Sequence, residues 1–264
     1  MELRCEGLAA SVEGQGPPLL LVHGTAADRT TWAVQRAGLA AQARLLLYDR
    51  RGSGASPLPA GREYATLEEH VRDAACVIEA HGPGPLVACG SSFGAVVVLE
   101  LARRRPGLLR GMVLLEPPLP ASEAQALIST EFWESLERTA HARGEAAAVE
   151  LFLRYVLGDE DFERMPRLAR VLVLERWEPI RRDCHALLSY RLDYASLGEV
   201  RTPALLLGGA RSPPQYAPAL EALGRALGQA SVEQIPGMGH MLHADVRGHF
   251  NRRLLQFMAE VGAS

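Results

Sequence analysis

The chain has 264 residues, of which 48% are hydrophobic, and its formal net charge is −3. This length fits one domain with room for an inserted subdomain, and the apolar fraction excludes an intrinsically disordered chain. The near-neutral charge and the lack of a long apolar run argue against nucleic acid or a membrane as a partner. A homo-oligomer stays open.

The N-terminal segment and the cysteines bear on the cellular compartment. No basic stretch followed by an apolar core opens the chain, so we expect no signal peptide and a cytoplasmic protein. The four cysteines lie far apart in the sequence and form no Cys-x-x-Cys motif, which favours reduced, buried side chains. They are Cys5, Cys76, Cys89 and Cys184.

Short apolar segments alternate with helical patterns after an opening hairpin expected at residues 2–13. This alternation predicts an α/β fold with a mostly parallel sheet covered by helices on both faces. The expected strands are 18–23, 43–48, 85–90, 111–116, 203–208 and 231–235. The expected helices are 29–42, 67–81, 93–105, 215–227 and 243–261.

The alternation stops between residues 117 and 198, where the sequence shows helical patterns only. Helices are expected near 121–142, 145–157, 161–176 and 178–191. We therefore predict a core made of residues 1–116 and 199–264, with residues 117–198 as a helical lid over the ligand site. The alternative is a set of packing helices away from that site.

The segment Gly90-Ser91-Ser92-Phe93-Gly94 lies between an expected strand and an expected helix. Gly-x-Ser-x-Gly in that setting is typical of a nucleophile elbow, a sharp turn that exposes the serine hydroxyl. The two glycines permit the turn because a side chain there would clash. Ser92 is thus the candidate nucleophile, and the amide of Phe93 at the helix start is a candidate oxyanion donor.

Three other motifs each follow an expected strand. They are His23-Gly24-Thr25-Ala26, the turn from Asp49 to Gly54, and Gly237-Met238-Gly239-His240. Together with the serine elbow, in this order along the chain, they resemble the α/β-hydrolase fold family. Thr25-x-x-Asp28 and Trp32, with the segment Leu-Glu-Pro-Pro at 115–118, resemble its capped, esterase-type branch. The resemblance covers essentially the whole chain and implies an eight-stranded sheet.

A serine nucleophile needs a base and a carboxylate that orients the base. His240 is the best base, since it follows a late strand in a glycine loop; the other histidines are expected to be structural, in the case of His23, or solvated or locally paired. The resemblance places the acid after strand 203–208, where this chain has no carboxylate. Glu116, at the end of strand 111–116, is the favoured acid, and Asp245 is a distant alternative. Asp49 is expected to brace its own turn.

The resemblance implies that the second oxyanion donor is the amide of Thr25, with Ala26 as the alternative. Ala26 is also a candidate for contact with the substrate. Trp133 and Trp177 of the lid are candidates for an apolar binding pocket, although residues at such spacing are more often lid core. No metal-ligand spacing and no nucleotide fingerprint occurs, so no metal or organic cofactor is expected.

These residues predict a serine hydrolase that cleaves a small hydrophobic ester through an acyl-enzyme intermediate, with a small molecule as its substrate. A cofactor-free haloperoxidase, a thioesterase and a carbon–carbon hydrolase use the same triad, and the sequence does not separate them. A receptor that binds a small molecule with little turnover is the alternative outside enzymes.

Overall fold

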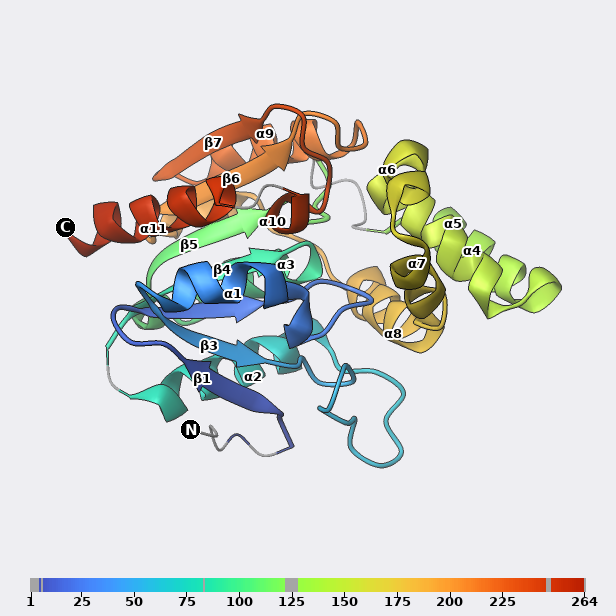
Figure 1. The fold of residues 1–264 in the computed structure, drawn as a ribbon, viewed down its shortest axis with the longest axis horizontal. Coiled ribbons are helices and arrows are strands. Elements are labelled where there is room, and N and C mark those ends of the chain that lie inside the picture. The colour runs from blue at the N-terminus through green and yellow to red at the C-terminus, as the bar shows by residue number, and fades with distance from the viewer. Residues whose placement is uncertain (1–4, 6, 83, 122–127, 246–247, 264) are drawn as a thin grey trace.

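A computed structural model describes residues 5, 7–82, 84–121, 128–245 and 248–263. Its centre is a seven-stranded sheet with the order β1-β3-β2-β4-β5-β6-β7 (Figure 1). The strands are β1 (Ala10–Glu13), β2 (Pro18–Val22), β3 (Arg44–Tyr48), β4 (Leu86–Ser91), β5 (Leu109–Leu115), β6 (Ala204–Gly209) and β7 (Ala230–Ile235). The six expected parallel strands are therefore present within one or two residues of their predicted ends.

The first strand is the only antiparallel one in the described sheet. Strand β1 pairs with β3 in the register Ala10 with Tyr48. The other arm of the expected hairpin falls largely on residues 1–4 and 6, which lie outside the described residues. The described sheet accordingly has seven strands, where the resemblance implied eight.

Both faces of the sheet are buried, as the apolar strand β2 shows. Leu19 and Leu21 of β2 pack into one core cluster, whereas Leu20 and Val22 pack into the other. This follows from the period of two along a strand, which sends successive side chains to opposite faces. An unbroken apolar run, rather than an alternating one, is what a sheet covered twice requires.

Two groups of helices cover these faces. The first consists of α1 (Ala33–Ala40), preceded by a 3-10 turn (Arg29–Trp32), with α10 (Leu242–Asp245) and α11 (His249–Gly262). The second consists of α2 (Leu67–His81), α3 (Phe93–Arg104) and α9 (Tyr216–Ala226). Across the described ranges, no helix combines the length and the apolar character needed to traverse a bilayer.

Five helices lie apart from the sheet layers, beyond the ends of the strands (Figure 1). They are α4 (Thr130–Arg143), α5 (Glu145–Leu157), α6 (Asp159–Arg164), α7 (Arg167–Val173) and α8 (Trp177–Leu188). The single helix expected over 161–176 is two helices, because Met165 precedes Pro166 and takes an extended backbone with ψ 132°. Proline disfavours helical geometry in the residue before it. The first part of the helix expected at 121–142 lies outside the described residues.

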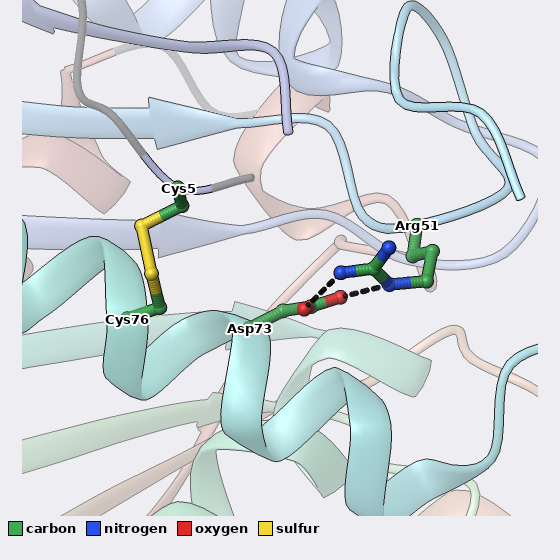
Figure 2. Close-up of a disulfide and its surroundings, with 4 residues drawn as sticks. All are labelled: Cys5, Arg51, Asp73 and Cys76. Atoms are coloured by element: carbon green, nitrogen blue, oxygen red, sulfur yellow. Dashed lines mark hydrogen bonds and ion pairs between the residues drawn. A yellow bond between two sulfur atoms is a disulfide. The ribbon is translucent and has the colours of Figure 1, made fainter. Parts of the chain in front are cut away.

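A disulfide links the N-terminal segment to helix α2 (Figure 2). Cys5 and Cys76 are joined across a sequence separation of 71 residues, with their Cα atoms 6.0 Å apart. The expectation of four reduced cysteines is therefore wrong for this pair, while Cys89 and Cys184 are free and buried. No local pattern in the sequence indicates the bond, since only the fold brings the two residues together.

Breaking this disulfide should lower the stability of the fold. A closed loop of this length constrains the unfolded chain and contributes about 2–4 kcal/mol. We expect a reductant, or the double substitution Cys5→Ser/Cys76→Ser, to lower the melting temperature by roughly 5–15 °C. Calorimetry with and without reductant measures this shift, and the double variant is the control because it should not respond to reductant. An unchanged melting temperature in reduced wild type would contradict the prediction.

Candidate active site

Ser92 lies on a sharp turn between β4 and α3. Its backbone has φ 53° and ψ −120°, a left-handed conformation that is rare for residues other than glycine. The main-chain N–H of Ser92 donates to the carbonyl of Leu115 at 2.8 Å, which ties the turn to the neighbouring strand β5. Phe93 is the first residue of α3, so its N–H is among those that the helix itself does not use.

The glycines on either side of Ser92 are required by close backbone contacts. A Cβ at Gly90 would lie 2.3 Å from the carbonyl oxygen of Gly94, and a Cβ at Gly94 would lie 2.3 Å from that of Val22. Neither position can hold a side chain unless the backbone moves. The turn therefore presses α3 against the end of β2, where the segment His23–Ala26 begins.

Glu116 and His240 form a buried pair at the ends of two different strands. The Nδ1 atom of His240 is 2.7 Å from Oε2 of Glu116, and the two side chains are 5% and 1% exposed. The other carboxylate oxygen accepts the N–H of Gly209 at 2.7 Å. The ring of Tyr216 stacks on His240 with centroids 4.6 Å apart. With Nδ1 on the carboxylate, Nε2 is the nitrogen left to face a substrate or a hydroxyl.

The end of β6, where the resemblance places the acid, supplies a backbone donor instead. Gly209 gives its N–H to Glu116, and a Cβ there would lie 2.5 Å from the carbonyl oxygen of Met238. Two residues later, Arg211 forms an ion pair with Asp161 of helix α6. The side chain of Asp245, the distant alternative acid, lies outside the described part of the structure.

The segment after β2 packs directly on the serine turn. A Cβ at Gly24 would lie 3.1 Å from Cβ of Ser92, and Ala26 has a left-handed backbone with φ 57°. His23 is fully buried; its Nε2 accepts the N–H of Arg50 at 2.9 Å, so its Nδ1 carries the proton and donates to the carbonyl of Gly24 at 2.9 Å. His23 is thus a structural histidine, as its position in the motif indicated.

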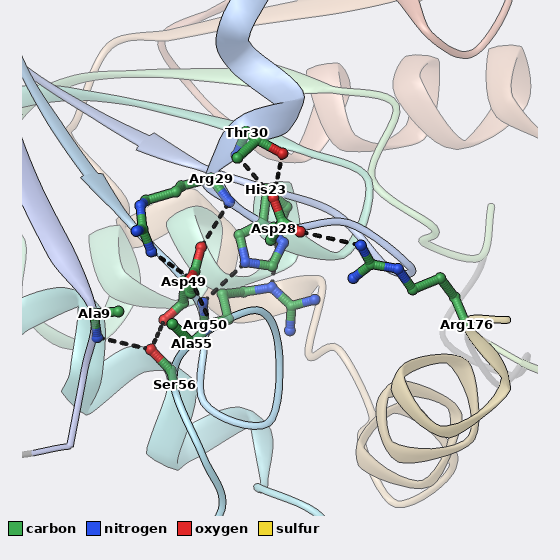
Figure 3. A network of polar contacts seen from close by, with 10 residues as sticks. All are labelled: Ala9, His23, Asp28, Arg29, Thr30, Asp49, Arg50, Ala55, Ser56 and Arg176. Atoms are coloured by element: carbon green, nitrogen blue, oxygen red, sulfur yellow. Dashed lines mark hydrogen bonds and ion pairs between the residues drawn. The ribbon is translucent and has the colours of Figure 1, made fainter. Parts of the chain in front are cut away.

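Asp49 braces the turn that follows β3 (Figure 3). Its carboxylate accepts the main-chain N–H groups of Arg29 and Ala55, each at 2.8 Å, and pairs with the Arg29 guanidinium. Its carbonyl accepts the hydroxyl of Ser56 at 2.7 Å. Asp49 therefore connects three chain segments, which agrees with the expected bracing role.

Two cavities meet at Ser92 and Thr25, both of which line each of them. The larger has a volume of about 590 Å³ and mainly apolar walls; these include Leu119, Ile128, Phe132, Phe152, Val156 and Leu187. The smaller has a volume of about 260 Å³ and is lined by Ala26, His240 and His243, among others. Ser92 and His240 therefore share the smaller cavity.

Trp133 and Trp177 are not among the described residues that line either cavity. Their indole rings stack on each other with centroids 6.3 Å apart, and Trp133 also contacts His185. The structure places both tryptophans in the packing of the helical insertion. Aromatic contact with the larger cavity comes instead from Phe132, Phe152 and Tyr155.

Two histidines expected to be solvated or locally paired are buried instead. His70 packs edge-on against Phe93 with centroids 5.2 Å apart, and His243 lies 4.6 Å from the Trp32 ring. Burial, reinforced by the nearby His240, lowers the pKa of His243 to about 4. Burial, reinforced by the positive charge of Arg50, lowers the pKa of His23 to about 3. The rings of His23 and His243 are therefore neutral at physiological pH.

Sequence reasoning missed the buried arginine beside the site. The guanidinium of Arg50 contacts the segment after β2, the ring of Phe93 and Asp183 of helix α8. Its only signal was an arginine two residues after an apolar strand, and a charged side chain that is buried there needs a partner. No cluster of three or more His, Cys, Asp or Glu side chains suited to a metal occurs among the described residues.

Comparison with known proteins bears on the family of the chain. Residues 19–249 match the sequence model described as the Alpha/beta hydrolase family. A pimeloyl-[acyl-carrier protein] methyl ester esterase of Nitrosospira multiformis is 26% identical over 260 residues, which cover 92% of this chain and 95% of the relative. A solved esterase structure from Thermogutta terrifontis superposes with a TM-score of 0.80 and 26% identity, covering 96% of this chain and 93% of that one.

Other relatives match over a shorter stretch. Two Klebsiella proteins named for carbamate hydrolysis are 32% identical over 155 residues, which is 58% of this chain and 56% of each relative. The chain therefore aligns with little more than half the length of these two proteins.

Removing the charge of Glu116 tests the assignment of the acid. In Glu116→Gln the amide can still hydrogen bond but no longer stabilises a positively charged His240, so we expect turnover to fall by about 10³-fold or more. Circular dichroism should show an unchanged fold. The matched control is Asp245→Asn, which should retain activity. Full activity in Glu116→Gln with an inactive Asp245→Asn would assign the acid to Asp245.

The buried neutral histidines predict a loss of stability in acid. The pKa values of His23 and His243 lie below the usual 6.5 in the folded state, so the unfolded state binds the extra protons as the pH falls. Between pH 7.5 and pH 5 each should remove about 2 kcal/mol from the free energy of unfolding. Urea unfolding at the two pH values measures the change. A constant free energy would show that these rings are not held neutral.

Proposed function

Since the chain belongs to the alpha/beta hydrolase family, we propose that it is a serine hydrolase that cleaves a small hydrophobic ester. Ser92 is the nucleophile, His240 the base and Glu116 the acid. The observation that carries the proposal is the buried contact of 2.7 Å between Glu116 and His240, because His240 lines the same cavity as Ser92. A buried carboxylate on one nitrogen of a histidine beside a strained serine is the arrangement that nucleophilic catalysis needs.

The reaction proceeds in two acyl transfers. Ser92 attacks the ester carbonyl while Nε2 of His240 takes the hydroxyl proton, and Glu116 stabilises the resulting positive charge. The amides of Phe93 and Thr25 bind the developing oxyanion; each such donor is worth on the order of 3 kcal/mol in the transition state. His240 then gives the proton to the leaving alcohol. Water repeats the sequence on the acyl-enzyme and releases the carboxylic acid.

The two cavities suggest which part of the ester goes where. The group that receives the proton from His240 must lie near that ring, so the leaving alcohol belongs in the smaller cavity, which Ala26 also lines. The acyl group then occupies the larger cavity, whose volume of about 590 Å³ lies in the range of small-molecule sites. Its apolar walls favour a hydrophobic acyl or aryl group.

The names of two relatives support cleavage of an acyl–oxygen bond. One is a methyl ester esterase and the other an esterase, and each aligns with more than nine-tenths of this chain. Thioester hydrolysis, carbon–carbon hydrolysis, cofactor-free haloperoxidation and a receptor with little turnover stay as alternative outcomes of the test below.

Substitution of the nucleophile is the direct test. Wild type should hydrolyse p-nitrophenyl esters in a series from acetate to decanoate, and a fluorophosphonate should label it. Ser92→Ala should lose both properties, with turnover reduced by about 10⁴-fold or more. The matched control is Ser196→Ala, whose hydroxyl only caps a local turn through the carbonyl of Asp193.

The outcomes separate the candidate functions. Sustained turnover that depends on Ser92 supports the esterase, and the preferred chain length measures the larger cavity. Stoichiometric labelling of Ser92 without sustained turnover of any ester would favour the receptor. Labelling that persists in Ser92→Ala would refute the assignment of the nucleophile.

A further inference from the structure

The Arg50 guanidinium is fully buried and contacts two carbonyls of the segment His23–Ala26, which supplies the proposed oxyanion donor Thr25. Its Nε donates to the carbonyl of His23 and one Nη donates to the carbonyl of Gly24, each at 3.0 Å. The side chain is 0% exposed. The carbonyl of Gly24 also accepts Nδ1–H of His23 at 2.9 Å, so two donors hold this one oxygen.

Fixing the carbonyl of Gly24 also fixes the amide of Thr25. The two groups belong to one peptide unit, which is planar, and in a trans unit the C=O and N–H point in opposite directions. Because the carbonyl points to Arg50, the N–H of Thr25 points away from Arg50. Thr25 lines both cavities that Ser92 also lines, and we infer that its N–H, directed away from Arg50, faces them as an oxyanion donor. Arg50 therefore orients the donor without touching the substrate.

The residue that supplies the other proposed donor, Phe93, contacts the same guanidinium through its ring. The central carbon of the Arg50 guanidinium lies 4.4 Å from the centroid of the Phe93 ring, in cation–π geometry. Phe93 is fully buried at the first position of α3. One side chain thus supports both chain segments that supply the amides of the proposed oxyanion hole.

The charge of Arg50 is balanced by the lid. Asp183 of helix α8 accepts two hydrogen bonds from the guanidinium, at 3.0 and 2.7 Å, and its side chain is only 6% exposed. Helix α8 makes a second contact on the same side, from Arg182 to the carbonyl of Gly52 at 3.1 Å. Just before the helix, Arg176 pairs with Asp28 at 3.3 Å, a contact drawn in Figure 3.

We propose that Arg50 and Asp183 are positioning residues that couple the packing of helix α8 on the core to the geometry of the oxyanion hole. The proposal rests on the proposed hydrolase function. A buried guanidinium without its carboxylate partner is an uncompensated charge, which strongly destabilises the native position of the side chain. The guanidinium must then move, or water must enter to solvate it. Either response removes the Arg50 hydrogen bonds from the carbonyls of His23 and Gly24, and the Gly24 carbonyl keeps only its bond from Nδ1–H of His23. The amides of Thr25 and Phe93 are then both in place only while α8 is packed on the core.

The neighbouring arginine provides a matched control. Arg51 makes the same two-pronged contact with Asp73, at 2.9 and 2.6 Å, but Asp73 is on core helix α2 (Figure 2). Asp73→Asn therefore removes the carboxylate that pairs with Arg51, the residue next to Arg50, and this carboxylate is not part of the lid. Both aspartates are nearly buried, so a purely structural role predicts similar behaviour for the two variants.

The experiment compares Asp183→Asn and Asp73→Asn with wild type in p-nitrophenyl butyrate hydrolysis and in binding of butylboronic acid. The boronic acid takes up the Ser92 oxygen as a fourth ligand while the proton passes to His240, and the resulting tetrahedral adduct occupies the oxyanion hole. We expect Asp183→Asn to lose about tenfold to a hundredfold in kcat, with KM within about twofold. Affinity for the boronic acid should fall by a similar factor. Asp73→Asn should lower the melting temperature and leave kcat within about twofold of wild type.

A second variant covers the case in which Asp183→Asn does not fold. Arg50→Met/Asp183→Leu removes both buried charges together, which such sites tolerate well. It should fold and still show the loss in kcat and in boronic acid affinity. Wild-type kcat in either Asp183 variant would overturn the coupling alone. A wild-type protein that neither turns over ester nor binds the boronic acid would overturn the proposed function and the coupling with it.

Discussion

The left-handed backbone at Ser92 is the constraint on which the site depends. It forces α3 to leave β4 so sharply that Gly94 contacts the carbonyl of Val22 at the end of β2. Because β2 and β4 are parallel neighbours, the segment after β2 then lies against the serine itself. A turn of any other shape would move the two chain segments apart and leave the serine without its neighbouring amides.

The position of Glu116 shows that a carboxylate can reach His240 from the end of β5 rather than from the end of β6. Strands β5 and β6 are adjacent, so a carboxylate at the end of β5 reaches the same histidine as one at the end of β6. The end of β6 then contributes an N–H group, which holds the carboxylate from its other side. Glu116 has a left-handed backbone with φ 40°, so the carboxylate at the end of β5 is held on a strained residue.

The sequence predicted the features that depend on local pattern and chain order. The parallel strands, the serine turn, and the placement of Glu116 and His240 at strand ends follow from apolar runs and motif spacing. Contacts between distant segments were missed, because no local signal carries them. The Cys5–Cys76 bond and the Arg50–Asp183 pair join residues 71 and 133 positions apart. The two tryptophans were equally undecidable, since aromatic spacing alone does not distinguish a pocket wall from a packed core.

The disulfide divides the chain into a covalent ring and an open remainder. The ring, from Cys5 to Cys76, contains β1 to β3, the segment after β2 and both arginines of the Asp49 turn. Ser92, Glu116 and His240 all lie outside it. A single backbone cut within the ring would therefore leave two fragments that stay joined under oxidising conditions, with the segment after β2 still tethered to the part that holds Ser92, Glu116 and His240. The same cut after reduction would release a separate N-terminal piece.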